Sequence, residues 1–100
     1  MDYQVLISKP ALADLETIVR FAAQVSGPKQ AERMGSELFD VMASRNHLPN
    51  RGSPVQGHAP LRKLSHRYYL IYYRVVEDVR RVEVVRIWDG RQRPADLHLP

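Results

Sequence analysis

The sequence predicts an α+β fold in the order β-α-α-β-β-β, with an N-terminal helical hairpin packed on one face of a small, mostly antiparallel sheet. Two observations predict this architecture. Apolar residues recur at helical spacing over 9–25 and again from 28 to about 47, and three short β-like runs follow residue 60. Helices grouped before a run of strands are typical of α+β proteins. A chain of 100 residues builds one hydrophobic core, so residues 1–100 are expected to form a single domain.

The first half of the chain reads as one strand and two helices. Residues 3–8, YQVLIS, are rich in β-favouring side chains, and Ser8 is a good N-cap for the helix over 9–25. Pro10 is tolerated in the first turn of that helix, where its missing N–H costs nothing. The sequence SGP at 26–28 ends the first helix and opens the second. Two helices joined by so short a turn form an antiparallel hairpin.

The second half reads as a loop followed by three strands. Residues 48–60 hold three prolines and two glycines, which is typical of irregular structure. Glu77 and Asp78 separate the last two β-like runs and indicate a tight hairpin between them. The three expected strands are residues 61–64, 67–76 and 79–88.

Both faces of the expected sheet carry aromatic or basic side chains. Alternation along the last strand separates one set of side chains from the other: Val79, Arg81, Glu83, Val85 and Ile87 against Arg80, Val82, Val84, Arg86 and Trp88. In the strand before it, Tyr68 and Tyr72 point one way, and Tyr69 and Tyr73 the other. Because one face covers the helices, the opposite face is expected to expose aromatics among arginines, a mixture that usually marks a contact surface. The alternative is that arginine stems merely cover apolar sheet surface.

Charge is unevenly distributed along the chain. The net charge is +4, yet residues 41–76 contain six basic residues and no acid. Such a positive field favours nucleic acid or an acidic protein as partner, the alternative being a surface that is basic for solubility alone. The sequence lacks cysteine, a leader segment at its beginning and any apolar run of about 18 residues. We therefore expect a cytoplasmic protein without a membrane partner.

Most familiar kinds of catalytic site are absent from the sequence. The four histidines show no metal-ligand spacing, there is no glycine-rich phosphate loop, and no nucleophile elbow is present. We expect no metal and no small-molecule cofactor. Metal-free cleavage of a phosphodiester would need a base, an acid and cations for the developing charge. The groups that could converge for this purpose, or that could simply position phosphates or be solvated, are Arg62, Lys63, His66, Arg67 and Arg91.

Five stretches together resemble a known family. ALADLETIVRFAAQ, LPNRGSPVQG, LRKL, YYLIYYRVVED and VVRIWDGRQRPADL look like the RelE/ParE superfamily of toxins from type II toxin–antitoxin systems, and the resemblance spans about residues 3–97. It implies a small sheet with a helical hairpin in the order β-α-α-β-β-β. This agrees with the order derived from periodicity alone.

The resemblance implies one of two activities. RelE-like members are ribosome-dependent endoribonucleases that cut messenger RNA, whereas ParE-like members bind and inhibit DNA gyrase. This chain has Tyr69 where RelE-like enzymes place an arginine, and Asp89 where related ribonucleases often have histidine. The final segment RPADLHLP lacks their terminal tyrosine. Only Arg62, Lys63 and Arg91 remain as catalytic candidates, so the resemblance favours the ParE-like branch, with no catalytic residues expected.

The ParE-like interpretation assigns binding roles to two sets of residues. The target would be contacted by Trp88, Asp89, Arg91 and Arg93, although Trp88 could instead close the core and Asp89 could pair with Arg91 or Arg93 to order the turn. A cognate antitoxin would bring acidic and apolar residues to a surface that includes Arg62, Tyr69 and Arg86. The expected partners are thus the antitoxin and gyrase, or alternatively the ribosome and mRNA. A third possibility is a non-toxic homologue that only binds an antitoxin.

Overall fold

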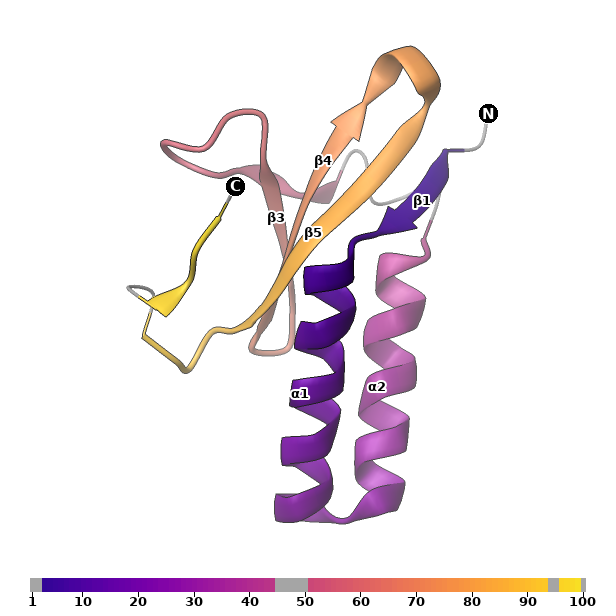
Figure 1. Ribbon diagram of the computed structural model, residues 1–100, viewed down its shortest axis with the longest axis vertical. Coiled ribbons are helices and arrows are strands. Elements are labelled where there is room, and N and C mark those ends of the chain that lie inside the picture. The colour runs from indigo at the N-terminus through magenta and orange to yellow at the C-terminus, as the bar shows by residue number, and fades with distance from the viewer. Residues whose placement is uncertain (1–2, 45–50, 94–95, 100) are drawn as a thin grey trace.

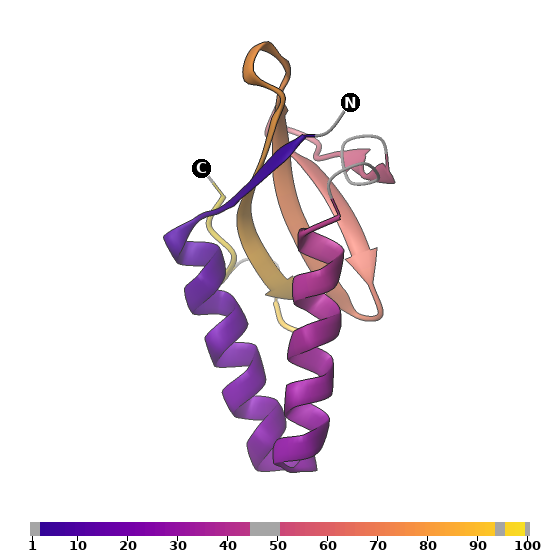
Figure 2. The same ribbon diagram turned by 90° about the vertical axis from the view of Figure 1, so that its right-hand side faces the viewer.

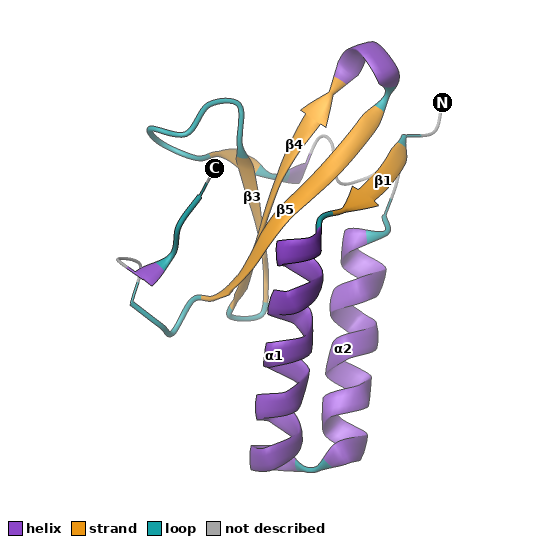
Figure 3. Ribbon diagram, viewed as in Figure 1, coloured by secondary structure: helices purple, strands orange, loops and turns teal. Residues whose placement is uncertain are grey.

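The described residues form two α-helices and a five-stranded sheet (Figure 1). It is a computed structural model that describes residues 3–44, 51–93 and 96–99. The predicted fold class and the order of its major elements are confirmed, with one short additional strand inside the predicted loop (Figure 3). The elements are β1 (Gln4–Ile7), α1 (Lys9–Ser26), α2 (Pro28–Met42), β2 (Ser53–Pro54), β3 (Arg62–His66), β4 (Tyr69–Val76), the 3₁₀ turn η1 (Glu77–Val79) and β5 (Arg81–Asp89).

The sheet has the strand order β1-β5-β4-β3-β2 and is mostly antiparallel. Only β1 and β5 run parallel, and they pair from Gln4 opposite Arg81 to Ile7 opposite Val84. The two helices lie side by side, and their far ends extend beyond the strands, as the two perpendicular views show (Figures 1 and 2). The first strand, β1, is therefore the outermost strand on one side of the sheet and pairs with the last strand, β5.

Ser8 joins β1 to α1 as the sequence predicts. Its hydroxyl accepts a hydrogen bond from the N–H of Ala11 at 3.2 Å, which caps the helix, and donates one to the carbonyl of Val85 at 3.1 Å. At the other end of α1, Gly27 has a φ of 90°, a conformation that favours glycine, and it connects the two helices in a single residue. These two positions set how the hairpin leaves the sheet.

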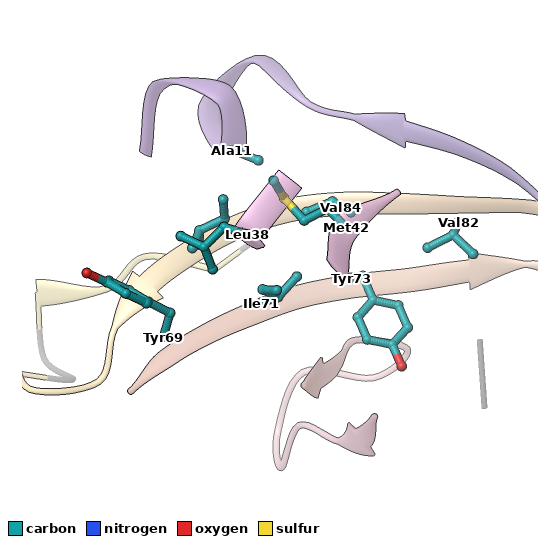
Figure 4. Close-up of a cluster of buried hydrophobic side chains, with 9 residues drawn as sticks. Ala11, Leu38, Met42, Tyr69, Ile71, Tyr73, Val82 and Val84 are labelled. Carbon is teal, nitrogen blue, oxygen red and sulfur yellow. The ribbon is translucent and has the colours of Figure 1, made fainter. Parts of the chain in front are cut away.

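The main hydrophobic core lies between the helices and one face of the sheet (Figure 4). The helices contribute Ala11, Leu38 and Met42, all fully buried. They pack on side chains of β4 and β5, namely Tyr69, Ile71, Tyr73, Val82, Val84 and Ile87. Tyr69 and Tyr73 share this face, as alternation along β4 predicts.

The opposite face of the sheet is covered, which corrects the expectation that it exposes aromatic residues. Tyr72 keeps only 6% of its surface and clusters with Leu61 and Val85. Half-buried apolar side chains from the preceding loop and from the C-terminal segment pack against this cluster: Val55, Leu70, Trp88, Leu97 and Leu99. The sheet therefore lies between two small cores. The second core forms because residues 96–99 fold back over the face that the alternation of side chains predicted to be exposed.

A β-bulge breaks the alternation predicted for β5. Tyr72 pairs with Arg86 and Tyr73 with Val84, so Val85 is an extra residue in the ladder. As a result Ile87 shares the helix-facing core with Val84, whereas Val85 belongs to the opposite cluster. The predicted grouping of Val85 with Ile87 is therefore wrong, since one inserted residue reverses every later side chain.

Several predicted boundaries also differ from the structure, including the starts of β4 at Tyr69 and of β5 at Arg81. Helix α2 ends at Met42 rather than near residue 47, and residues 45–50 lie outside the described part of the chain. The link between β4 and β5 is longer than a two-residue turn, because the turn η1 is followed by Arg80 in a left-handed conformation with a φ of 48°. Strand β3 starts at Arg62 and extends to His66, two residues beyond the predicted end.

Candidate functional site

The end of β5 is an ordered turn rather than the start of a loose tail. Strand β5 ends at Asp89, and the N–H of Gln92 donates to the Asp89 carbonyl at 2.9 Å, which closes a β-turn. One Asp89 carboxylate oxygen also accepts the backbone N–H of Arg91 at 2.9 Å. This side-chain-to-backbone bond two residues on is an Asx turn. The sequence WDGRQ thus forms a short, hydrogen-bonded corner.

Asp89 also holds the side chain of Arg91. The guanidinium Nε and Nη2 lie 3.0 and 2.7 Å from the two carboxylate oxygens, a two-pronged ion pair. The side-chain hydrogen bond from Arg91 lowers the pKa of Asp89 from its usual 3.8, and the same bond raises the pKa of Arg91. Of the two pairings considered for Asp89, the one with Arg91 is present. Asp89 therefore orders the turn and neutralises the nearby cation.

Arg91 lies over the ring of Tyr68. Its guanidinium carbon is 3.7 Å from the ring centroid, within the range of a cation–π contact. Gly90 allows this approach, because its N–H donates to the Tyr68 carbonyl at 2.7 Å and an added Cβ would lie 2.7 Å from the same oxygen. Tyr68 belongs to the β3–β4 turn, so the site combines two separate segments of the chain.

Trp88 and Arg93 flank this corner differently. Trp88 is half-buried and packs against the cluster of Leu61, Tyr72 and Val85, so it contributes to the second core. Arg93 is exposed. Of the four expected target-binding side chains, only Arg91 and Arg93 present most of their surface to a partner, since Asp89 keeps 13% of its side-chain surface.

A groove opens beside this corner, at the far end of the helical hairpin. It has a volume of about 330 Å³, and its walls come from α1, α2, the β3–β4 turn and Arg91. Its most exposed apolar side chains are Phe21, Val25 and Tyr68, at 57%, 67% and 43%. The lining residues are Phe21, Ala22, Val25, Ser26, Gln30, Arg33, Met34, Glu37, Arg67, Tyr68, Tyr69 and Arg91.

The groove is lined by both apolar and basic side chains. It contains three arginines and one acid, Glu37, whose carboxylate pairs with Arg67 at 3.1 Å. Arg33 is exposed on α2. Because Arg67 and Arg91 are each paired within the chain, the arrangement is poorly suited to a multiply charged phosphate. It suits a segment with apolar side chains and a few acids.

The three residues expected to bind an antitoxin have structural contacts instead of an open surface. Arg62 donates through Nη2 to the carbonyl of Gly52. Tyr69 is 3% exposed, its hydroxyl lies 3.0 Å from the sulfur of Met34, and burial raises the pKa of Tyr69. The expectation that Tyr69 lies on an exposed basic and aromatic face is wrong, because its ring faces the helices.

Arg86, the third of these residues, forms the most extensive polar contact between the helices and the sheet. Its Nε and Nη2 lie 2.7 and 3.0 Å from the two oxygens of Asp14 on α1, and its Nη1 donates to the carbonyl of His98. Asp14 also accepts the N–H of Ile87 at 2.9 Å. Sequence reasoning missed this network, since residues 72 positions apart leave no local signal that they meet.

The three ribonuclease candidates do not converge. Strands β3 and β5 are separated by β4, and Arg62 pairs with Tyr73 in the ladder, whereas Asp89, which holds Arg91, pairs with Tyr69. Four strand residues separate these levels, about 13 Å at roughly 3.3 Å per residue. Lys63 faces the opposite side of the sheet from Arg62. Arg62, Lys63 and Arg91 therefore do not surround one point.

Two further observations concern metals and membranes. Within residues 3–44, 51–93 and 96–99, no three histidine or acidic side chains gather closely enough to hold a metal ion. Among the described helices, neither is long and apolar enough to cross a membrane.

Comparison with known proteins supports the resemblance read from the sequence. A family model described as the ParE toxin of the type II toxin–antitoxin system parDE matches residues 5–94. No curated protein sequence matches the chain.

Several solved structures share the fold. The RelBE2 toxin–antitoxin complex from Mycobacterium tuberculosis has 18% identity and a TM-score of 0.69, and the match covers 89% of this chain and 92% of that one. A chromosomal ParDE system from P. aeruginosa has 21% identity and a TM-score of 0.62, over 85% and 92%. The isolated RelE toxin of E. coli has 17% identity and a TM-score of 0.54, over 93% and 89%. At these identities the structures establish the fold alone.

Proposed function

Because the chain belongs to the ParE toxin family of type II toxin–antitoxin systems, we propose that it acts by binding and inhibiting DNA gyrase, and that it catalyses no reaction. The observation that carries this proposal is the ordered corner at the end of β5, which presents Arg91 on the ring of Tyr68. Arginine and tyrosine are among the residues that most often anchor protein interfaces. Gyrase acts on DNA in the cytoplasm, where the proposal places this toxin.

The arrangement of basic residues supports binding over RNA cleavage. Metal-free cleavage needs several charged groups around one phosphate. Arg91 is paired with Asp89, and Arg62 and Lys63 lie farther along the sheet on opposite faces. A site with these positions lacks the cations that would stabilise the developing charge. A contact surface does not require such convergence.

We further propose that the cognate antitoxin of this toxin occupies the groove at the far end of the helical hairpin. Contiguous exposed apolar side chains mark binding sites, and Phe21 and Val25 are both more than half exposed there. The basic side chains of the groove, with Arg33 exposed on α2, would favour acidic residues in the bound segment. This moves the predicted antitoxin surface from Arg62 and Arg86 to the groove, where Tyr69 is one of the lining residues.

The experiment that tests the main proposal uses antitoxin-free toxin in two parallel assays. One measures supercoiling by purified gyrase, and the other measures mRNA cleavage on programmed ribosomes. Inhibited supercoiling with intact mRNA is the expected result. Cleaved mRNA with normal supercoiling would instead favour the RelE-like activity. The chain also shares its fold with the isolated RelE toxin. Normal results in both assays, together with normal growth on expression, would favour a non-toxic antitoxin-binding homologue.

A further inference from the structure

We propose that Tyr68 and Arg91 act as one composite contact on the target, and that Asp89 is a positioning residue whose carboxylate holds Arg91. This inference rests on the proposed function, since it describes how the same surface is built. It changes the role of Asp89 from a contact to a support. It also adds Tyr68, from a different segment, to the surface that recognises the target.

Exposure separates the contact residues from their support. The side chain of Arg91 keeps 53% of its surface and Tyr68 keeps 43%, whereas the side chain of Asp89 keeps 13%. Asp89 bonds to the Nε and Nη2 of Arg91, which leaves Nη1 for a partner. A partner approaching this corner therefore meets the guanidinium and the tyrosine ring, with the carboxylate behind them.

The pairing reduces the cost of binding through Arg91. A free arginine loses side-chain entropy when a partner immobilises it. Here the Asp89 carboxylate and the Tyr68 ring already hold the guanidinium in one orientation. The N–H groups of Nη1 can then bond an acceptor of the target, either a carboxylate or a backbone carbonyl. This bond requires little further ordering of the Arg91 side chain.

The position of Tyr68 depends on the same corner. The bond from the N–H of Gly90 to the Tyr68 carbonyl ties the β3–β4 turn to the end of β5. Tyr69 pairs with Asp89 in the sheet ladder, which adds a second link between the segments. The ring of Tyr68 and the guanidinium of Arg91 therefore move as one unit.

Removing the negative charge of Asp89 distinguishes two explanations, because they predict opposite changes in the strength of inhibition. If Arg91 acts only through its positive field, then removing the neighbouring negative charge should strengthen inhibition. If Asp89 positions Arg91, then Asp89→Asn should weaken inhibition although it makes the surface more positive. The matched control is Asp78→Asn in the exposed turn η1, which changes the net charge equally at the opposite end of the sheet.

The experiment measures the toxin concentration that halves supercoiling for folded variants. Asp89→Asn and Tyr68→Leu should each raise it by about tenfold, in line with the loss of an interface anchor, while Asp78→Asn should match the wild type. Tyr68→Phe, which keeps the ring that Arg91 covers, should lose less potency than Tyr68→Leu. Adding Tyr68→Leu to Arg91→Ala should cause little further loss, because the two side chains act together.

A second readout reports the position of Arg91 directly. In wild-type toxin, the Nε–H of Arg91 should give an NMR signal protected from exchange with water, and Asp89→Asn should abolish this protection. Unchanged melting temperatures would separate these effects from unfolding. Asp89→Asn toxin that inhibits as well as or better than the wild type would overturn the positioning role. Full potency of Tyr68→Leu would overturn the composite contact.

These outcomes are distinct from a failure of the proposed function. If wild-type toxin arrests growth but leaves supercoiling intact, gyrase is not the target and the proposed function is wrong. The same variants are then ranked by growth arrest at equal expression. If Asp89→Asn and Tyr68→Leu are both less toxic than Asp78→Asn, the composite contact is still supported. If either of the two stays fully toxic, the composite contact is rejected.

Discussion

The carboxylate of Asp14 forms a two-pronged ion pair with the guanidinium of Arg86, at 2.7 and 3.0 Å, although 72 residues separate them. Asp14 is on the first helix and Arg86 is on the last strand, immediately after the bulge at Val85. The same carboxylate accepts the N–H of Ile87 at 2.9 Å. One acid therefore secures the helical hairpin to the part of the strand that leads to the candidate site.

Replacing Asp14 should destabilise the whole domain. Breaking a fully buried ion pair costs about 3–5 kcal/mol, and this pair retains 17% and 23% of its side-chain surface, so Asp14→Ala should lower the free energy of unfolding by about 2 kcal/mol. Chemical denaturation measures this change. Glu16→Ala, which removes an exposed acid from the same helix, is the matched control and should stay within about 0.5 kcal/mol of the wild type. Equal stability of both variants would contradict the role of Asp14.

Arg91→Ala should abolish growth arrest without unfolding the domain. Arg91 is half exposed and lies at the surface of the corner, so its removal leaves both cores intact. Growth after induction and the circular dichroism melting curve measure the two effects. Arg20→Ala removes an exposed arginine from α1 and should remain toxic. Full toxicity of Arg91→Ala at equal expression would remove the corner from the active surface.

The Asp89 carboxyl should titrate below its usual pKa of 3.8, because the Arg91 side chain donates hydrogen bonds to its charged form. Since the folded pKa is lower than that of the unfolded chain, the pair stabilises the fold above about pH 3.8 and loses this contribution as pH falls through the folded value. Titration of the carboxyl carbon by NMR measures the midpoint. In Arg91→Ala the midpoint should rise, and an unchanged midpoint would show that the ion pair does not form in solution.

The groove predicts where the antitoxin binds. Val25→Gln places an amide among the exposed apolar side chains that line the groove and should weaken antitoxin binding by about tenfold, a loss of 1.4 kcal/mol. Calorimetry or surface binding measures the dissociation constant. Val79→Gln alters a similarly exposed valine at the other end of the molecule and should leave binding unchanged. Equal affinity of the two variants would place the antitoxin elsewhere.

Gly52 should tolerate no side chain. An added Cβ would lie 2.3 Å from the hydroxyl oxygen of Tyr73 and 2.8 Å from the carbonyl oxygen of Lys63. Gly52→Ala should therefore lower stability by about 1–3 kcal/mol, as overpacking usually does. Thermal unfolding measures the loss, and Ser53→Ala at the exposed neighbouring position is the control. An unchanged melting temperature would mean that the backbone at residue 52 can move away from Tyr73 and Lys63 at little cost.

Much of the fold could be predicted because its signals are local. Ser8 is read as a helix cap from its own residue type and from the apolar spacing after it, and the structure confirms the cap. Periodicity likewise placed Tyr69 and Tyr73 on one face. The bulge at Val85 could not be predicted, because its insertion depends on how β4 and β5 pair, and adjacent valines fit either face.

Only part of the candidate site could likewise be predicted from the sequence. The sequence alone indicated the toxin superfamily and directed attention to Arg91 at the end of the last strand. Only the tertiary structure showed that Tyr69 is buried, that Arg86 forms an ion pair with Asp14, and that Arg91 lies over the ring of Tyr68. The physical reason is that helix caps and periodic patterns act over a few residues. The partner of a charged or aromatic side chain, in contrast, is chosen by packing that joins distant segments of the chain.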